Sequence, residues 1–238
     1  MFMLLMTLGF TSQAFSAILI ANADLNGDGV AEQIYNTGST ITVKNNQGVT
    51  TAIYYVAGSW AMMGIADLDG TAGAEIAVRT FTQMIVITHR TKKIYPYDLS
   101  IYGGAWIGVT IDEFDGVAGN EVAINTGAFS NGYSSLLFVS HRTHTVKQHF
   151  FSTAPTWGIL NINDFNGAAG KEVAINTGTL GYVAILHPKN LVARYYSVGI
   201  ISQLISVSNL DGVAGLEIRV RGYGNAIYTI NDRKGTVK

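Results

Sequence analysis

Short apolar runs separated by turn residues dominate the hydrophobic pattern of the chain. Residues 60–99 contain four such runs, each rich in β-branched or aromatic residues and bounded by Gly, Asp, Asn or Thr: Trp60–Ala66, Glu75–Thr80, Gln83–His89 and Lys93–Leu99. Runs of this length and composition predict β-strands. No window keeps a 3.6-residue apolar period between helix caps, so we expect almost no helix.

The pattern repeats five times along the chain. In each copy an acid or amide lies three residues before a Gly, and a Glu follows five residues after that Gly. The repeated cores are Ala23–Ile34, Ala66–Ile76, Asp112–Val122, Asn163–Val173 and Ser208–Ile218. In this alignment the first copy carries an extra residue, Gln33, before its Ile.

The spacing of the copies indicates the fold class. The first-column residues are Asp24, Asp67, Glu113, Asp164 and Asn209, so the period lies between 43 and 51 residues. Periods of this length with short strands are typical of propeller blades rather than helical solenoids. We therefore predict an all-β, single-domain β-propeller of five blades over residues 17–238, each blade with about four antiparallel strands. The predicted units are approximately 17–59, 60–105, 106–156, 157–201 and 202–238.

Residues 1–16 allow two interpretations. They form an apolar segment with small residues at Ala14 and Ser16, as in a signal peptide, but without a basic start, and the run is too short to span a membrane. Alternatively, Leu4–Phe10 supply a strand to the last unit, which has only residues 236–238 left for its fourth strand. The first interpretation predicts a secreted, periplasmic or cell-surface bacterial protein.

Composition excludes several classes of function. Charged residues make up 13% of the chain and the net charge is −1, so no basic surface directs it to nucleic acid or to anionic membranes. The chain has no cysteine, which excludes disulfides, thiolate nucleophiles and cysteine-bound zinc. There is no G-x-S-x-G, H-E-x-x-H or G-x-x-x-x-G-K motif, and the carboxylates nearly all belong to the repeated turns. We therefore expect no enzymatic activity.

The first repeated loop carries a set of oxygen ligands. Asp24, Asn26, Asp28 and Glu32 stand at positions i, i+2, i+4 and i+8, and Gly29 permits the chain to reverse. Oxygen donors that converge in a tight loop suit Ca²⁺. The loop, the period and the strand pattern resemble the FG-GAP/VCBS repeats of integrin-α-like propellers. That resemblance covers roughly residues 17–238, and it implies a loop between the first two strands of a blade, a structural Ca²⁺ ion and a role in adhesion or surface attachment.

The later loops depart from this pattern. Their i+4 position holds Thr71, Val117, Ala168 or Val213, so each loses one ligand. Asp67, Asp69 and Glu75 of the second unit make a weaker candidate set. The alternative for every loop is a metal-free turn, in which the first acid or amide accepts backbone N–H groups and the Glu fixes the loop.

Two further columns point to a candidate ligand site. Trp60, Trp106 and Trp157 each lie seven residues before the first-column acid. A second column stands four residues after the repeated Glu and includes Arg79, Asn125, Asn176 and Arg221. Because the turns of successive hairpins alternate between the two edges of a blade, both columns are expected on one rim. The indoles either pack between blades or form an aromatic platform for sugar rings or another flat ligand; the polar column is either turn chemistry or part of that site.

The predicted function follows from these features. We predict a non-enzymatic secreted binding or adhesion module with a structural Ca²⁺ ion in its first repeat, whose partner is a protein or a surface glycan. The first alternative is a carbohydrate-binding propeller lectin that uses the Trp and Asn/Arg rim. The second is a propeller-type polysaccharide-active enzyme, which would need unpaired acids and Arg at the channel mouth, and the sequence shows no such combination. Nucleic acid and a membrane span are not expected.

Overall fold

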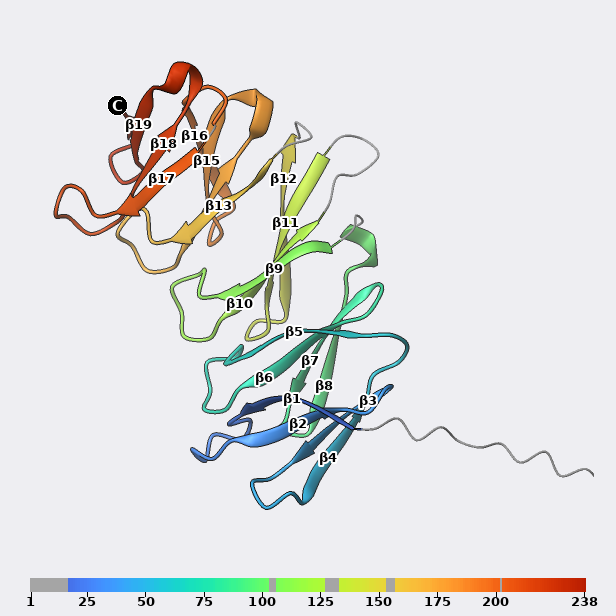
Figure 1. The fold of residues 1–238 in the computed structure, drawn as a ribbon. Helices are drawn as coiled ribbons and strands as arrows, with labels where there is room; N and C mark the ends of the chain where they lie inside the picture. Colours follow the sequence, from blue (N-terminus) through green and yellow to red (C-terminus); the bar gives the residue numbers. More distant parts are fainter. Residues whose placement is uncertain (1–16, 103–105, 127–132, 153–156, 202) are drawn as a thin grey trace, which may run out of the picture.

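The computed structural model of the chain describes residues 17–102, 106–126, 133–152, 157–201 and 203–238. Within these residues the chain forms five antiparallel sheets of four strands each, and every sheet is built from four strands that are consecutive in sequence (Figure 1). One repeat unit supplies one sheet, which we call a blade. The predicted all-β fold of five four-stranded propeller blades is confirmed.

The strands follow one another in chain order through the five blades. Blade one consists of β1 (Ile18–Ala23), β2 (Glu32–Asn36), β3 (Thr40–Lys44) and β4 (Thr50–Tyr55). Blade two consists of β5 (Ala61–Ala66), β6 (Glu75–Arg79), β7 (Gln83–Thr88) and β8 (Lys93–Asp98). Blade three consists of β9 (Trp106–Asp112), β10 (Glu121–Thr126), β11 (Tyr133–Ser140) and β12 (Thr145–Ser152). Blade four consists of β13 (Gly158–Asn163), β14 (Glu172–Asn176), β15 (Tyr182–His187) and β16 (Val192–Ser197). Blade five consists of β17 (Gln203–Ser208), β18 (Glu217–Arg221), β19 (Ile227–Asn231) and β20 (Thr236–Val237).

The strands predicted in unit two match β5 to β8, with ends that differ by one residue at most. Helical structure in the described residues is limited to three short 3₁₀ segments, Ser100–Tyr102, Gly178–Leu180 and Tyr223–Asn225. This agrees with the absence of a 3.6-residue apolar period in the sequence. Nowhere in the described part of the chain is a helix long and apolar enough to cross a membrane.

Apolar layers join consecutive blades. The middle strands of blades two, three and four are buried on both faces, because alternate side chains point to the preceding and the following blade. Between blades one and two, for example, Ile34 and Val43 pack with Ile76 and Ile87, and all four side chains are fully buried. Three more clusters of this kind join blades two and three, three and four, and four and five. We call each of these layers a seam.

A backbone contact between loops accompanies every seam. The loop between the first two strands of a blade donates one N–H group to the equivalent loop of the preceding blade, from Ala74 to the carbonyl of Asp24 at 2.8 Å and from Asn120 to that of Asp67 at 2.8 Å. Lys171 and Leu216 make the same contact to Glu113 and Asp164. Close approach explains the repeated Gly: a Cβ atom on Gly70, whose φ is +78°, would lie 2.5 Å from the carbonyl oxygen of Ala118.

The five blades follow an open arc, with blade one and blade five at its two ends (Figure 1). Each core cluster of the described residues is shared by blades that are consecutive in sequence, and none joins blade five to blade one. The fourth strand of blade five, β20, is a stub that pairs with β19 through Ile230–Val237 and Asn231–Thr236. The candidate closing strand Leu4–Phe10 and the candidate signal peptide lie outside the described residues.

The register corrects one detail of the repeat alignment. Gln33 is paired with Lys44 as Ile76 is paired with Ile87, and Glu32 and Glu75 are both paired with the last residue of the first strand. Gln33 is therefore not an extra residue. It occupies the position of Ile76, and the alignment was wrong here because it matched Ile34 to Ile76 by residue type.

Candidate functional site

The repeated acidic loops all lie on one rim of the array, which we call the loop rim, together with the β3–β4-type turns. In each loop the first-column side chain accepts the N–H of the Gly three residues later; the distance is 2.7 Å from Gly27 to Asp24 Oδ1 and from Gly70 to Asp67 Oδ1. The repeated Glu is almost fully buried, and its Oε2 accepts the N–H of the residue after the first column. Both columns therefore hold the loop in shape, as turn chemistry requires.

The loops differ at the second oxygen of this Glu. In unit one, the Nδ2 group of Asn26 donates to Glu32 Oε1 and to Asp28, each at 3.0 Å. In unit four, Asn166 donates to Glu172 in the same way at 2.6 Å. In unit five, Asn231 of the neighbouring strand donates to Glu217 at 2.5 Å. An amide N–H thus satisfies the buried carboxylate in three of the five loops.

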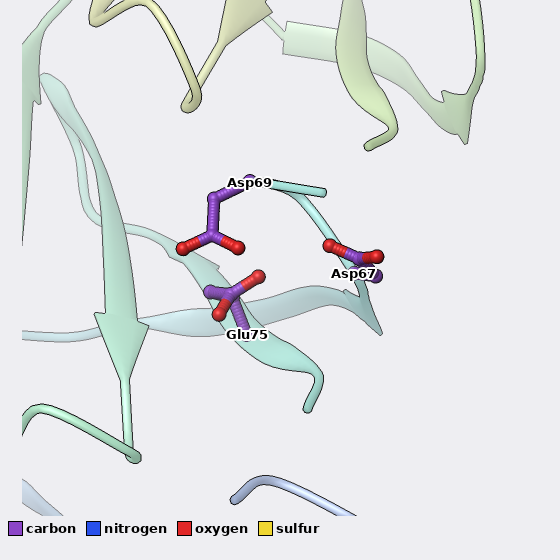
Figure 2. Close-up of side chains that lie close together, drawn as sticks. All are labelled: Asp67, Asp69 and Glu75. Atoms are coloured by element: carbon purple, nitrogen blue, oxygen red, sulfur yellow. The ribbon is translucent and has the colours of Figure 1, made fainter. Parts of the chain in front are cut away.

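Units two and three have a carboxylate, Asp69 or Asp115, where units one and four have the amides Asn26 and Asn166. Asp67, Asp69 and Glu75 place oxygen atoms within 4.8 Å of one another, and Glu113, Asp115 and Glu121 do the same. Asp69 and Glu75 approach each other closely in Figure 2, and Asp67 completes the group from the start of the loop. One Arg neutralises part of each group: Arg90 lies 3.4 Å from Asp69 and Arg142 lies 2.8 Å from Asp115.

Burial and nearby negative charge act on the Glu of these two groups. Burial, and then the neighbouring carboxylates, raise the pKa of Glu75 to about 7, against the lowering effect of the Leu68 N–H. The pKa of Glu121 is raised to about 7 for the same reasons. A hollow of about 240 Å³, lined by Phe114, Glu121, Ser140 and neighbouring residues, adjoins the unit-three group. These residues could hold a hard cation, because three carboxylates converge and, among the described residues, no amide donates to the second oxygen of Glu75 or Glu121.

The predicted unit-one set fits a cation less well. Asp24 accepts N–H groups from Gly29, Gly27 and Asn26, which lower its pKa. The Oδ1 of Asn26 accepts the N–H of Asp28 at 2.9 Å, so its NH₂ group points to the carboxylates of Asp28 and Glu32. The Ca²⁺ site of unit one stays a prediction, while the side-chain arrangement favours units two and three.

The opposite rim carries the aromatic and Asn/Arg columns, and we call it the aromatic rim. A hollow of about 580 Å³ opens between blades two and three and is lined by Trp60, Arg79, Phe81, Leu99, Ser100 and Trp106, among others. Arg79 bridges the two blades, because its Nη1 donates to the carbonyl of Trp106 at 3.3 Å. Trp60 Nε1 donates to the carbonyl of Gly38 at 2.8 Å, which fixes its indole. Phe81, in the turn closed by Thr80 N–H to Gln83, is 97% exposed.

The structure brings together only part of the predicted rim set. Trp60, Trp106 and Arg79 share the hollow. Trp157 stacks on Phe151, with ring centroids 5.5 Å apart and an interplanar angle of 28°. It therefore packs against the seam between blades three and four. Asn176 accepts the N–H of Gly178 at 2.8 Å, which is turn chemistry.

The other two polar members of the column lie apart from this hollow. Arg221 donates to Asn225 within blade five at 3.5 Å. Asn125 is paired with Gly108, and the hairpin that follows it lies outside the described residues.

Sequence reasoning missed a set of Tyr–His contacts across the seams. The hydroxyl of Tyr54 lies 2.7 Å from His89 Nδ1 of the next blade, and that of Tyr97 lies 2.6 Å from His141 Nδ1. Between blades four and five, Tyr196 donates to Asp232 instead, at 2.6 Å. The recurrence of His at the third-to-fourth-strand turn was visible, but its Tyr partner lies 35 or 44 residues earlier in the chain.

Comparison with known proteins finds similarity to solved structures only. No protein-family model matches the chain, and no curated protein matches it. A solved structure of an Agrocybe aegerita lectin, described by its specific recognition of non-reducing terminal N-acetylglucosamine, covers 95% of this chain with 14% sequence identity and a TM-score of 0.52. The chain spans 65% of the length of that lectin.

Two looser matches are a chain of the BBS1N–ARL6DN complex and the Neurospora crassa Pan2 WD40 domain. The first has 9% identity and a TM-score of 0.45 over 92% of this chain and 64% of the other. The second has 11% identity and a TM-score of 0.42 over 92% and 61%. At 14% identity the likeness to the lectin supports the fold alone, and this chain is a propeller-type array of β-blades.

Proposed function

We propose that the chain is a non-enzymatic binding module that takes a carbohydrate ligand in the hollow of the aromatic rim. One observation carries the proposal: two indoles, a guanidinium group and a 97% exposed phenyl ring converge on one hollow between blades two and three. Aromatic faces supply stacking area, and convergent polar groups orient a ligand. The likeness to a lectin that recognises terminal N-acetylglucosamine suggests which sugars to test first.

The test compares two exposed aromatic side chains on hairpin turns. Phe81 lines the hollow, whereas Tyr223, 77% exposed, lies on the corresponding turn of blade five. We expect glycan-array binding by the wild type, confirmed by calorimetry with the best ligand, and at least tenfold weaker binding by Phe81→Ala. Tyr223→Ala should bind like the wild type. Equal loss in both variants, or no glycan bound at millimolar concentration, contradicts the carbohydrate proposal and leaves a protein ligand to be sought.

We assign the repeats to the FG-GAP/VCBS type and propose a structural role for Ca²⁺ in units two and three. The support is the pair of three-carboxylate groups in loops that otherwise hold amides. Asp67, Asp69 and Glu75 would hold one ion, and Glu113, Asp115 and Glu121 the other. A bound cation would neutralise a buried carboxylate and stiffen the loop beside a seam.

Replacing one acid in each group by the amide of the other loops tests this role. Ca²⁺ at 100 times its Kd adds about 2.7 kcal/mol of stability per site. We expect Ca²⁺ to raise the Tm of the wild type and a chelator to reverse the rise. Asp69→Asn with Asp115→Asn should abolish the response while raising the Tm without metal, because the amide mimics Asn26 and Asn166. Asp28→Asn is the matched control for unit one; if it alone removes the response, the ion belongs in unit one.

Export stays a prediction from residues 1–16. Intact mass and N-terminal sequencing of the protein recovered from cells test it directly. Cleavage after residue 16 is the expected result, and recovery of an uncleaved chain from the cytoplasm contradicts it.

A further inference from the structure

The face that each blade turns toward the preceding blade has four middle-strand positions, two on its second strand and two on its third. In blades two to four these positions are apolar and at most 6% exposed, and in blade five three are fully buried and the fourth is Tyr228. The residues are Ile76, Val78, Ile85, Ile87; Val122, Ile124, Leu137, Val139; Val173, Ile175, Ala184, Leu186; and Ile218, Val220, Tyr228, Ile230. They make one half of every seam.

Blade one is polar at the same four positions. The register places Gln33, Tyr35, Thr42 and Lys44 there, and all four are partly exposed. Two contacts link three of them: the Tyr35 hydroxyl donates to Gln33 Oε1 at 3.0 Å, and Lys44 Nζ lies 4.8 Å from the Tyr35 ring centroid. Burying this face against a sheet would remove these polar groups from water without new partners, which is costly.

Apolar residues on the same side of blade one do not restore a seam. Ile53 is 53% exposed on the outermost strand, but the matching residue of blade four, Tyr195, is also 54% exposed although that blade has neighbours on both sides. This outer position therefore does not belong to the seam. Leu19, 46% exposed beside Tyr35, and Tyr55, 77% exposed on the outermost strand, are the apolar exceptions.

Blade five has two polar substitutions on the opposite face, where a following blade would pack, while Ile227 on that face stays apolar and is 45% exposed. Arg219 stands where blades two to four have a buried Ala, and Thr229 stands where they have Val86, Phe138 and Ile185. Lys238 exchanges backbone hydrogen bonds with Thr229. Leu210 is 50% exposed, whereas its counterparts in the other blades are 1–2% exposed. A Cβ atom on Gly212 would meet nothing within 4 Å.

We propose that these two end faces are solvent-facing caps, so that the five blades form an open array that neither closes on itself nor joins a second copy end to end. Polar outer faces on terminal units are what a linear repeat array needs for solubility. Charge supports the same conclusion, because Lys44 at one end and Arg219 and Lys238 at the other would repel each other across a closing seam. The inference is independent of the proposed ligand.

The first test measures the gap between the ends. The chain has no cysteine, so paired nitroxide labels can be placed at Thr42→Cys and Thr229→Cys without background. The control pair, Lys147→Cys and Lys189→Cys, lies across the seam of blades three and four, where Lys147 Nζ contacts the Lys189 carbonyl at 3.0 Å. We expect a clearly longer distance for the end pair than for the control, unchanged on tenfold dilution. A distance as short as that of the control would overturn the proposal.

The second test converts the caps into seam faces. One variant carries Gln33→Ile, Thr42→Ile, Lys44→Ile, Arg219→Ala and Thr229→Val, which give both ends the residue types of the seams. Light scattering should find the wild type monomeric and the variant in concentration-dependent oligomers, with an unchanged β-type circular dichroism spectrum. A wild type that self-associates, or a folded variant that remains monomeric at about tenfold higher concentration, contradicts the role assigned to these side chains.

Discussion

Residues on the loop rim and residues on the aromatic rim differ in what their side chains contact. On the loop rim, the repeated acids and amides bond to their own backbone, and His89 and His141 bond to a Tyr of the preceding blade. On the aromatic rim, Phe81 is 97% exposed and borders the hollow between blades two and three. The comparison teaches that a column present in every unit marks architecture, whereas an exposed residue outside the columns is the better candidate for function.

The largest expected effect concerns the apolar residue that follows the first column. Phe165 is 1% exposed, whereas Leu210 at the same position of blade five is 50% exposed. We expect Phe165→Ala to cost about 3–5 kcal/mol in the free energy of unfolding, because a buried ring leaves a cavity. Leu210→Ala should cost less than about 1.5 kcal/mol. Urea titrations of both variants check this; similar losses would show that blade five is covered as the other blades are.

The second-largest expected effect on stability concerns the repeated Gly of the loop rim. A Cβ atom on Gly70 would lie 2.5 Å from a carbonyl oxygen of blade three, but on Gly212 it would meet nothing within 4 Å. Both have positive φ, so Ala at either position costs about 1–2 kcal/mol in backbone strain. Gly70→Ala should lose about 1–3 kcal/mol more, because the loop contact must open. Thermal melts of the pair measure the difference, and equal Tm values would rule out a clash at the seam.

The smallest expected effect is the pH dependence of the histidines on the loop rim. Burial lowers the pKa of His141 to about 4. Its neutral form is therefore favoured by folding, so this stability is present above about pH 6.5 and is lost as pH falls toward 4. The carboxylates of Asp232 and Glu172, 3.1 and 3.5 Å from its ring nitrogens, raise the pKa of His187 to about 9. Its contribution is present below about pH 6.5 and is lost as pH rises through 9.

Single variants separate these two dependences. His141→Gln should flatten the acid limb of the Tm profile and His187→Gln the alkaline limb, by about 1–3 kcal/mol each. Scanning calorimetry between pH 4 and 10 gives the profiles. If His141→Gln changes the alkaline limb instead, the assignment of protonation states is incorrect.

The architecture could be predicted from the sequence because the same residue types recur at the same positions of each repeat unit. The Gly and Glu columns fixed the period, and the strands of unit two were placed to within one residue. The error at Gln33 arose because residue type was matched across units, whereas the strand register depends on partners that the sequence does not show. Contacts between distant columns were equally invisible: the Tyr54–His89 pair depends on three-dimensional neighbours. The change from Asn26 to Asp69 is visible in the sequence, but the donation of the amide to the buried Glu is not.

The candidate hollow was predictable only in part. Trp60, Trp106 and Arg79 were expected on one rim and share the hollow, but Phe81 belongs to none of the repeated columns and was not singled out. Trp157 stacks on Phe151, because the outer strand of blade three offers a ring there. All three indoles are partly buried and pack against a seam cluster, so what distinguishes Trp157 is its ring neighbour, which its own column does not reveal.

The polar outer face of blade one also bears on how the chain folds as it is synthesised. The ribosome releases the N-terminal blade first, before a following blade exists to cover it. With Gln33 and Lys44 on its outer side, the emerging blade needs a partner on one side only. Within the described residues every seam joins consecutive units, so these core contacts can form without the two ends of the array meeting. We therefore expect order to spread from blade one along the arc, each completed blade serving as the template for the next.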